Sequence, residues 1–273
     1  MRWRVRFGYG GTGFHGWARQ PGHRTVEGEV LRGLRVAGVV PRSTRHLEVA
    51  SRTDRGVSAR ANALAIATRL DGRSLLRVLN GVAPDIYFTA AAPMTADARI
   101  RQALGRTYRY FEDPGGRDLA AYQAAAAALV GRVDVRSFGR AVPRAGPVWR
   151  TVDRMSVRAT ECGWEVEVAA PSFVWGMVRK MVGACREVAD GRLPLPRLRR
   201  AVEGTERLTP PMAEPEGLVL WEVRYPDPWT AVWAGPNRHQ SLALASARSA
   251  ERARGAVESS LSGEVPLTRE ASI

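Results

Sequence analysis

The sequence has few of the residues that build metal and disulfide sites. Its 273 residues include four scattered histidines and two cysteines, Cys162 and Cys185. Two cysteines cannot form a disulfide framework, and no cysteine–histidine spacing matches a zinc site. The sequence therefore predicts no metal site, and its low cysteine content indicates a reducing, cytoplasmic environment.

Long apolar runs and nucleotide-binding glycine patterns are also missing. No stretch of 18 apolar residues occurs, and the first residues, MRWRVRFGYG, lack the apolar core of a signal peptide. Neither a G-x-G-x-x-G nor a Walker pattern is present. We therefore expect no membrane span, and the sequence offers no motif for a bound nucleotide.

Negative charge and lysine are scarce beside arginine. The chain has 41 Lys+Arg against 27 Asp+Glu, a net charge of +14, and Lys180 is its one lysine, which leaves 41 − 1 = 40 arginines. Phosphate contacts supply most of the non-specific affinity of proteins for nucleic acid, so nucleic acid is the leading predicted partner. An anionic membrane surface is a weaker alternative, because no basic amphipathic segment stands out.

Apolar periodicity predicts elements in two halves of the chain. Residues 2–9 alternate as a strand, and Thr25 is placed to cap a helix. In the second half Asp118 caps a helix that stops at Gly131, and the helical period of the clearest helix begins at Phe173. Both halves mix helices with strands of antiparallel type, which indicates an α+β architecture.

The Pro-Gly-Gly that follows residue 113 divides these halves. We predict an N-terminal α+β domain over residues 1–113 and a C-terminal α+β domain over residues 114–228. Residues 229–273 are rich in Ala, Ser and Arg and are predicted to be an extension that is either helical or disordered.

A single carboxylate among arginines is the first candidate functional group. In SRTDRGVSAR, Asp54 stands between Arg52 and Arg55, on a predicted connection between two strands. Such connections commonly carry functional groups on a rigid scaffold. Taken alone, Asp54 reads first as a turn residue that bonds its own backbone. The other reading is an ionised acid that arginines hold in place beside a polyanion.

Six segments in chain order resemble the motifs of one enzyme family, the tRNA pseudouridine synthase A (TruA) family. They run from about residue 5 to residue 226. The segments are YGGTGFHGWARQPGHRTVEGEV, SRTDRGVSA, LNGVAPDIYF, ADARIRQALGRTYRYF, PSFVWGMVRKMVG and PEGLVL. One such match is modest support, whereas six in order are a specific signal.

The resemblance implies isomerisation of uridine to pseudouridine in tRNA, in the anticodon stem-loop at tRNA positions 38 to 40. It implies a pseudouridine synthase fold, in which two antiparallel sheets merge across a central cleft with helices on the outer faces. It also implies a homodimer and no metal or organic cofactor. Asp54 matches the family's catalytic carboxylate, which either attacks C1′ of the ribose or takes a proton from C2′.

The same resemblance assigns four substrate-binding residues. Arg179 pairs with Asp54 from the second half of the chain, and a guanidinium beside a carboxylate favours its ionised form. Arg52 helps to extrude the target nucleotide, because C1′ inside a stem is reached only after base flipping. Tyr108 stacks on the flipped uracil, and Leu218 packs beneath the base.

Departures from the family pattern keep two other functions open. Gly10 stands where the family has Asp, and Ser58 where it has His. These changes motivate an RNA-binding protein on the same scaffold that has lost catalysis. A hydrolase with Asp54 as nucleophile is a third hypothesis, which no metal set or Ser-His-Asp arrangement supports. Retention of Asp54, Tyr108 and Arg179 together favours the enzyme.

Overall fold

The computed structural model describes residues 1–40, 44, 46–140, 142–143, 145–160 and 163–232. Cys162 and residues 233–273, most of the predicted extension, therefore lie outside the described residues. Of that extension, Ala231–Val232 form a short strand, β11, which the sequence did not predict. Among the described residues, no helix is long and apolar enough to cross a membrane.

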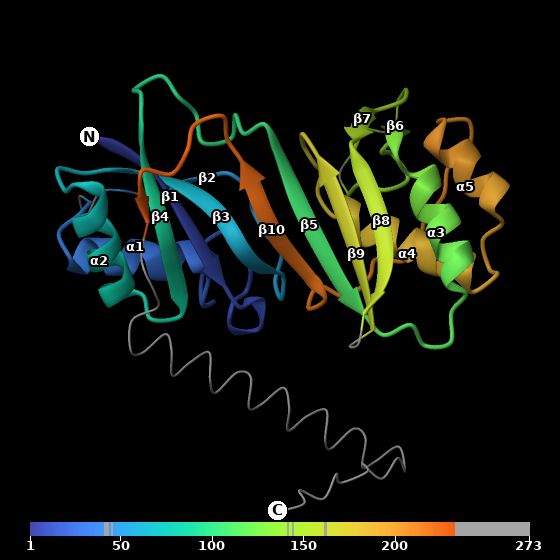
Figure 1. Cartoon of the computed structure of the whole chain (residues 1–273), viewed down its shortest axis with the longest axis horizontal. Coiled ribbons are helices and arrows are strands. Elements are labelled where there is room, and N and C mark those ends of the chain that lie inside the picture. The colour runs from blue at the N-terminus through green and yellow to red at the C-terminus, as the bar shows by residue number, and fades with distance from the viewer. Residues whose placement is uncertain (41–43, 45, 141, 144, 161–162, 233–273) are drawn as a thin grey trace, which may run out of the picture. The chain divides into compact units, whose positions relative to one another are not determined.

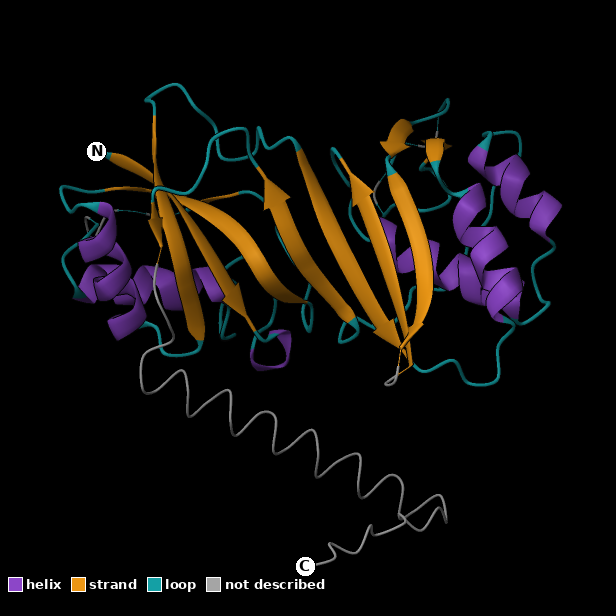
Figure 2. Cartoon of the chain, in the orientation of Figure 1, coloured by secondary structure: helices purple, strands orange, loops and turns teal. Residues whose placement is uncertain are grey.

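The strands of the described residues form one large sheet and one small pair. The large sheet has nine strands in the order β11-β4-β1-β3-β10-β5-β9-β8, with β2 attached to β3, and β6 pairs with β7 (Figures 1 and 2). The strands are β1 (Arg2–Tyr9), β2 (Glu48–Val49), β3 (Ser58–Ala67), β4 (Ile86–Met94), β5 (Gly105–Glu112), β6 (Gly131–Asp134), β7 (Trp149–Val152), β8 (Arg154–Thr160), β9 (Gly163–Ala170), β10 (Leu218–Arg224) and β11.

The α-helices pack beside both ends of the large sheet (Figure 1). In the first half, α2 packs on β4 and contacts α1; in the second half, α3 packs on β8 and contacts α4 and α5. The helices are η1 (Gly11–Gly13, a 3-10 turn), α1 (Val26–Val36), α2 (Gly72–Val82), α3 (Leu119–Ala128), α4 (Met177–Ala189) and α5 (Leu195–Val202). Two predicted caps are confirmed: the Thr25 side chain accepts a bond from Gly28 N, and the Asp118 side chain from Ala120 N and Ala121 N.

The junction of the two halves of the sheet is a parallel strand pair. β10 pairs in parallel with β3, with Val219 opposite Ser58, and pairs antiparallel with β5, with Leu220 opposite Tyr108. The two halves therefore merge side by side, which confirms the predicted α+β class with merged sheets. β5 lies beyond β10, beside β9, although it precedes residue 113. The sheet is thus continuous across the predicted boundary, and the domain limits stay a prediction.

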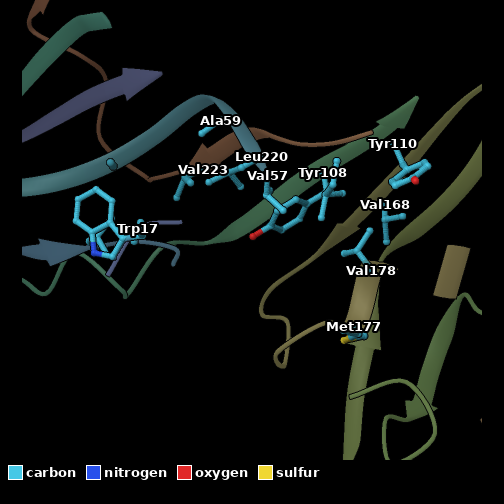
Figure 3. Packing of buried hydrophobic residues seen from close by; sticks show 14 of the residues in the cluster. Trp17, Val57, Ala59, Tyr108, Tyr110, Val168, Met177, Val178, Leu220 and Val223 are labelled. Carbon is cyan, nitrogen blue, oxygen red and sulfur yellow. The ribbon is translucent and has the colours of Figure 1, made fainter. Parts of the chain in front are cut away.

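Alternating apolar residues build a core that runs through the junction. The buried face of β1 carries Trp3, Val5, Phe7 and Tyr9, as the period-2 pattern predicts. Near the junction Val57, Leu220 and Tyr108 lie together (Figure 3). The same figure shows Tyr110, Val168 and Val178 grouped where α4 meets the sheet. One continuous core therefore supports the residues on both sides of the junction.

Two predicted helix limits are wrong, and a glycine explains the first. The helix expected from Phe173 begins at Met177, because Gly176 has a φ of 76°, in the left-handed region that an α-helix does not use. The helix expected to stop at Gly131 ends at Ala128, and Gly131, with a φ of 95°, begins β6. The first correction leaves residues 172–176 as a loop beside the site described next.

Candidate active site

Asp54 lies on the connection between β2 and β3, as the sequence predicts. This connection is held by the glycine-rich segment after β1: Trp17 N donates to Thr53 O (3.0 Å), and the Tyr9 hydroxyl bonds Thr53 Oγ1 (2.7 Å). Gly16 has a φ of 82°, and a Cβ there would lie 2.8 Å from Thr53 O. Gly16 thus allows a close backbone approach that fixes the Asp54 connection.

Both oxygens of the Asp54 carboxylate have a partner from the second half of the chain. Arg179 Nη1 lies 3.3 Å from Oδ2, and the indole Nε1 of Trp175 donates to Oδ1 at 2.9 Å. Arg179 is itself fixed, because its Nε donates to Ala213 O at 2.6 Å. The Asp54 side chain is 32% exposed and the Arg179 side chain 14%. The carboxylate is therefore oriented by the protein and still open to a ligand.

A cavity of about 1350 Å³ lies around this carboxylate. All five residues that the sequence assigned to the site line it: Arg52, Asp54, Tyr108, Arg179 and Leu218. They come from the β2–β3 connection, β5, α4 and the start of β10. The parallel register of β10 with β3 explains part of this gathering, because it sets Leu218 beside Val57, three residues after Asp54.

Tyr108 forms an aromatic wall of the cavity. Its side chain is almost buried, and its ring meets Phe173 edge-on at a centroid distance of 5.1 Å. Burial raises the pKa of the Tyr108 phenol, while a bond with Ser51 and the nearby charge of Arg106 lower it by less. The hydroxyl is therefore protonated at physiological pH and can donate a hydrogen bond into the cavity.

The charge of the cavity favours a polyanion. Six arginines but only two carboxylates, Asp54 and Glu216, are among its lining residues; the arginines are Arg52, Arg55, Arg101, Arg106, Arg140 and Arg179. Arg106 braces the wall, since its guanidinium donates to the carbonyl oxygens of Pro171, Ala50 and Arg101. The remaining positive charge can attract phosphate groups.

The sequence predicted no metal site, and the arrangement of potential metal ligands among the described residues bears on that prediction. Within them, no group of three or more His, Cys, Asp or Glu side chains is placed to hold a metal ion. Cys185 is buried, and His15 and His23 stack on each other at a centroid distance of 4.3 Å. The two histidines also line the cavity, although the sequence did not assign them to the site.

Trp175 and Arg140 are site residues that sequence reasoning missed. Trp175 was read as part of the predicted helix, whereas it lies in the loop before α4 and bonds Asp54. Arg140 stacks on its ring, with the guanidinium carbon 4.4 Å from the ring centroid. The signal available in the sequence was Gly176, which indicates that the helix begins after Trp175.

The two departures that motivated a non-catalytic protein lie outside the cavity lining. Ser58 Oγ accepts a hydrogen bond from Gly11 N at 3.0 Å, which ties the start of β3 to η1, next to Gly10. Neither Gly10 nor Ser58 is among the described residues that line the cavity. These substitutions therefore leave the surroundings of Asp54 and Arg179 intact.

Comparison with known proteins agrees with the family resemblance. The family model described as tRNA pseudouridine synthase matches residues 125–226. Relatives named tRNA pseudouridine synthase A include that of Thermococcus kodakarensis, 36% identical over 83% of this chain and 85% of the relative. That of Thermococcus onnurineus is 37% identical over 82% and 85%. That of Methanosphaerula palustris is 34% identical over 89% of each chain.

A solved structure is a weaker match. A chain of "Crystal Structure of a Cbf5-Nop10-Gar1 Complex" has a TM-score of 0.36 and 13% identity, over 67% of this chain and 45% of that one. This likeness is too low to add to the argument. The curated relatives are similar along most of their length, and the similarity includes the segments that carry Asp54 and Arg179. On that basis, the chain belongs to the tRNA pseudouridine synthase family.

Proposed function

We propose that this chain converts uridine to pseudouridine in tRNA through Asp54. The N1–C1′ bond of the uridine breaks, the uracil rotates, and a C5–C1′ bond forms. C5 loses its proton and N1 gains one, so atoms and electrons balance without an oxidant or reductant. Two routes use the same carboxylate: Asp54 adds to C1′, or it takes the C2′ proton to give a glycal that is later reprotonated.

One observation carries this proposal. An oriented aspartate lies in a cavity lined by arginines, and an arginine from a distant part of the chain holds it. The cavity suits a phosphate-bearing substrate, and the carboxylate is open enough to reach a sugar carbon. Binding alone would gain nothing from a negative group in a polyanion site, so this arrangement supports the enzyme over an RNA-binding protein without catalysis.

The other residues of the site are proposed to bind the target nucleotide after it has flipped out of the stem. Arg52 is exposed at the cavity and is proposed to extrude the nucleotide or to take its place in the stem. Tyr108 is proposed to stack on the uracil, and Leu218 to pack beneath it. Unstacking the base costs about a few kcal/mol, which contacts of this kind offset.

The proposed target is the anticodon stem-loop, at tRNA positions 38 to 40. Incubation of the protein with several unmodified tRNAs, followed by mapping of pseudouridine, should give modification in this region. Modification confined to another arm contradicts the regional assignment. Binding with no pseudouridine at any position favours the non-catalytic RNA-binding protein, and strand cleavage or base release favours the hydrolase.

We further propose that the protein acts as a cytoplasmic homodimer, a proposal supported by the family resemblance and by the low cysteine content. Light scattering of the free protein should then give a mass near twice that of the 29.9 kDa chain. A protein mass near that of one chain, both free and within the tRNA complex after the mass of the tRNA is subtracted, rules the dimer out.

Binding to tRNA should weaken steeply with salt. If Arg52, Arg55, Arg101 and Arg140 each contact a phosphate, affinity should fall about a hundredfold between about 50 mM and 200 mM salt, because bound counterions are released. Arg52→Ala should reduce the log–log slope by about one. Arg197→Ala should leave the slope unchanged, because Arg197, on α5, pairs with Glu206 and lies outside the cavity lining. A flat salt dependence would mean that the arginines are not used for RNA.

A further inference from the structure

Trp175 is the exposed tryptophan of the cavity, and three contacts hold it there. The residue is 53% exposed although its side chain is large and mostly apolar. Its carbonyl accepts a bond from Arg140 N at 2.7 Å, the Arg140 guanidinium lies over its ring, and its Nε1 donates to Asp54 Oδ1. Exposed indole surface is unfavourable in water, so an indole fixed in this way is suited to a partner that covers it.

The loop that carries Trp175 is built to place it. Gly176 turns the chain with a φ of 76°, which lets α4 begin at the next residue. A Cβ at Gly176 would lie 2.7 Å from Met212 and 3.5 Å from Arg140, so the loop is packed on both sides. Trp175 lies four residues before Arg179 in the sequence. With this turn between them, the two side chains reach different oxygens of the Asp54 carboxylate.

An aromatic ring backed by arginine is a common platform for unpaired nucleobases. Stacking of a base on such a ring tolerates any base, because every base presents a π-face. Arg140 polarises the ring from one side and adds positive charge for the phosphates. Tyr108, the family's stacking residue, is by contrast nearly buried and edge-on to Phe173. The cavity therefore holds a second aromatic group, which the proposed roles leave unused.

We propose that Trp175 has two linked functions in this site. Its indole N–H orients the Asp54 carboxylate, and its exposed ring stacks on a nucleobase of the bound RNA next to the target uridine. Trp175 is thus a positioning residue for the acid and a binding residue for the substrate. The expected effect of Trp175 on the rate of pseudouridine formation rests on the proposed function. Its bond to Asp54 and its stacking on a base can both be tested without catalysis.

Three variants separate the two functions. Trp175→Phe keeps a ring and loses the N–H, so tRNA affinity should stay within about twofold while the single-turnover rate falls roughly tenfold. Trp175→Ala loses both, so affinity should also weaken roughly tenfold. Trp221→Phe is the matched control: Trp221 stacks on Arg60 and Arg109 outside the cavity lining, and its loss should change neither quantity.

A spectroscopic readout tests the contacts directly. The chain has eight tryptophans, and the indole N–H signal of Trp175 is identified by its disappearance in Trp175→Phe. That signal should move in Asp54→Ala, which removes its acceptor, and should move again in the parent protein when tRNA is added. If it is unmoved in Asp54→Ala, or if Trp175→Phe keeps the parental rate, the positioning function is wrong.

The stacking function has its own contrary result. If Trp175→Ala binds tRNA as tightly as the parent, no base stacks on Trp175. These binding and spectral measurements remain decisive even if the parent protein forms no pseudouridine. Absence of pseudouridine in the parent would contradict the proposed function and not the contacts of Trp175.

Discussion

Asp54→Asn should abolish pseudouridine formation and leave tRNA affinity equal to that of the parent or tighter. Asn has the shape of Asp but can neither add to C1′ nor take a proton from C2′, so the rate should fall by at least about 10⁴-fold. Removing a negative charge from a cavity lined by six arginines relieves repulsion with RNA phosphates. Pseudouridine mapping under single-turnover conditions gives the rate, and filter binding gives the affinity.

Two further variants make this result specific. Arg179→Ala leaves the carboxylate in place but without the contact to Oδ2, so its rate should fall less, by roughly 10²-fold. Asp153→Asn changes an exposed aspartate outside the cavity lining and should keep the parental rate. If Asp54→Asn converts uridine at anything near the parental rate, the SRTDRGVSA motif is not the active site.

The elements that the sequence predicted well are those fixed by local chemistry. The alternation in β1 and the caps at Thr25 and Asp118 depend on neighbours within a few residues, and the structure confirms them. Local signals could not give the sheet order, because the parallel pair of β10 with β3 joins segments about 160 residues apart and leaves no periodic trace.

Prediction of the site depended on motifs more than on periodicity. The family resemblance named five residues, and the structure brings all five to one cavity, although their roles stay predictions. Trp175 was missed because apolar periodicity continues from Phe173 into α4 and hides the change of backbone at Gly176. Arg140 was missed because its contact with Trp175 bridges two loops that are distant in the sequence.

Glu112→Ala should lower the free energy of unfolding by about 3 kcal/mol, because it breaks a buried ion pair from one side. Glu112 ends β5, and its side chain is 2% exposed. Its two oxygens accept bonds from the Tyr122 hydroxyl of α3 and from Arg186 Nε of α4, both at 2.6 Å. Arg186 keeps a bond to Glu214, which places the loss at the lower end of the range for such pairs. Thermal unfolding should show a Tm lower by roughly 10 °C.

The same change tests how α4 is anchored, because α4 carries Arg179 as well as Arg186. Glu112→Gln keeps one acceptor oxygen but puts an NH2 group, which cannot accept, in place of the other, so it loses the charge and one of the two bonds. Its Tm should therefore lie between those of Glu112→Ala and the parent. Glu206→Ala is the control, since Glu206 pairs with Arg197 and Arg200 at the surface and its loss should leave Tm close to the parental value. If Glu112→Ala is no less stable than Glu206→Ala, the buried pair does not hold α4 on β5, and Arg179 must be positioned by its bond to Ala213 and the packing around it.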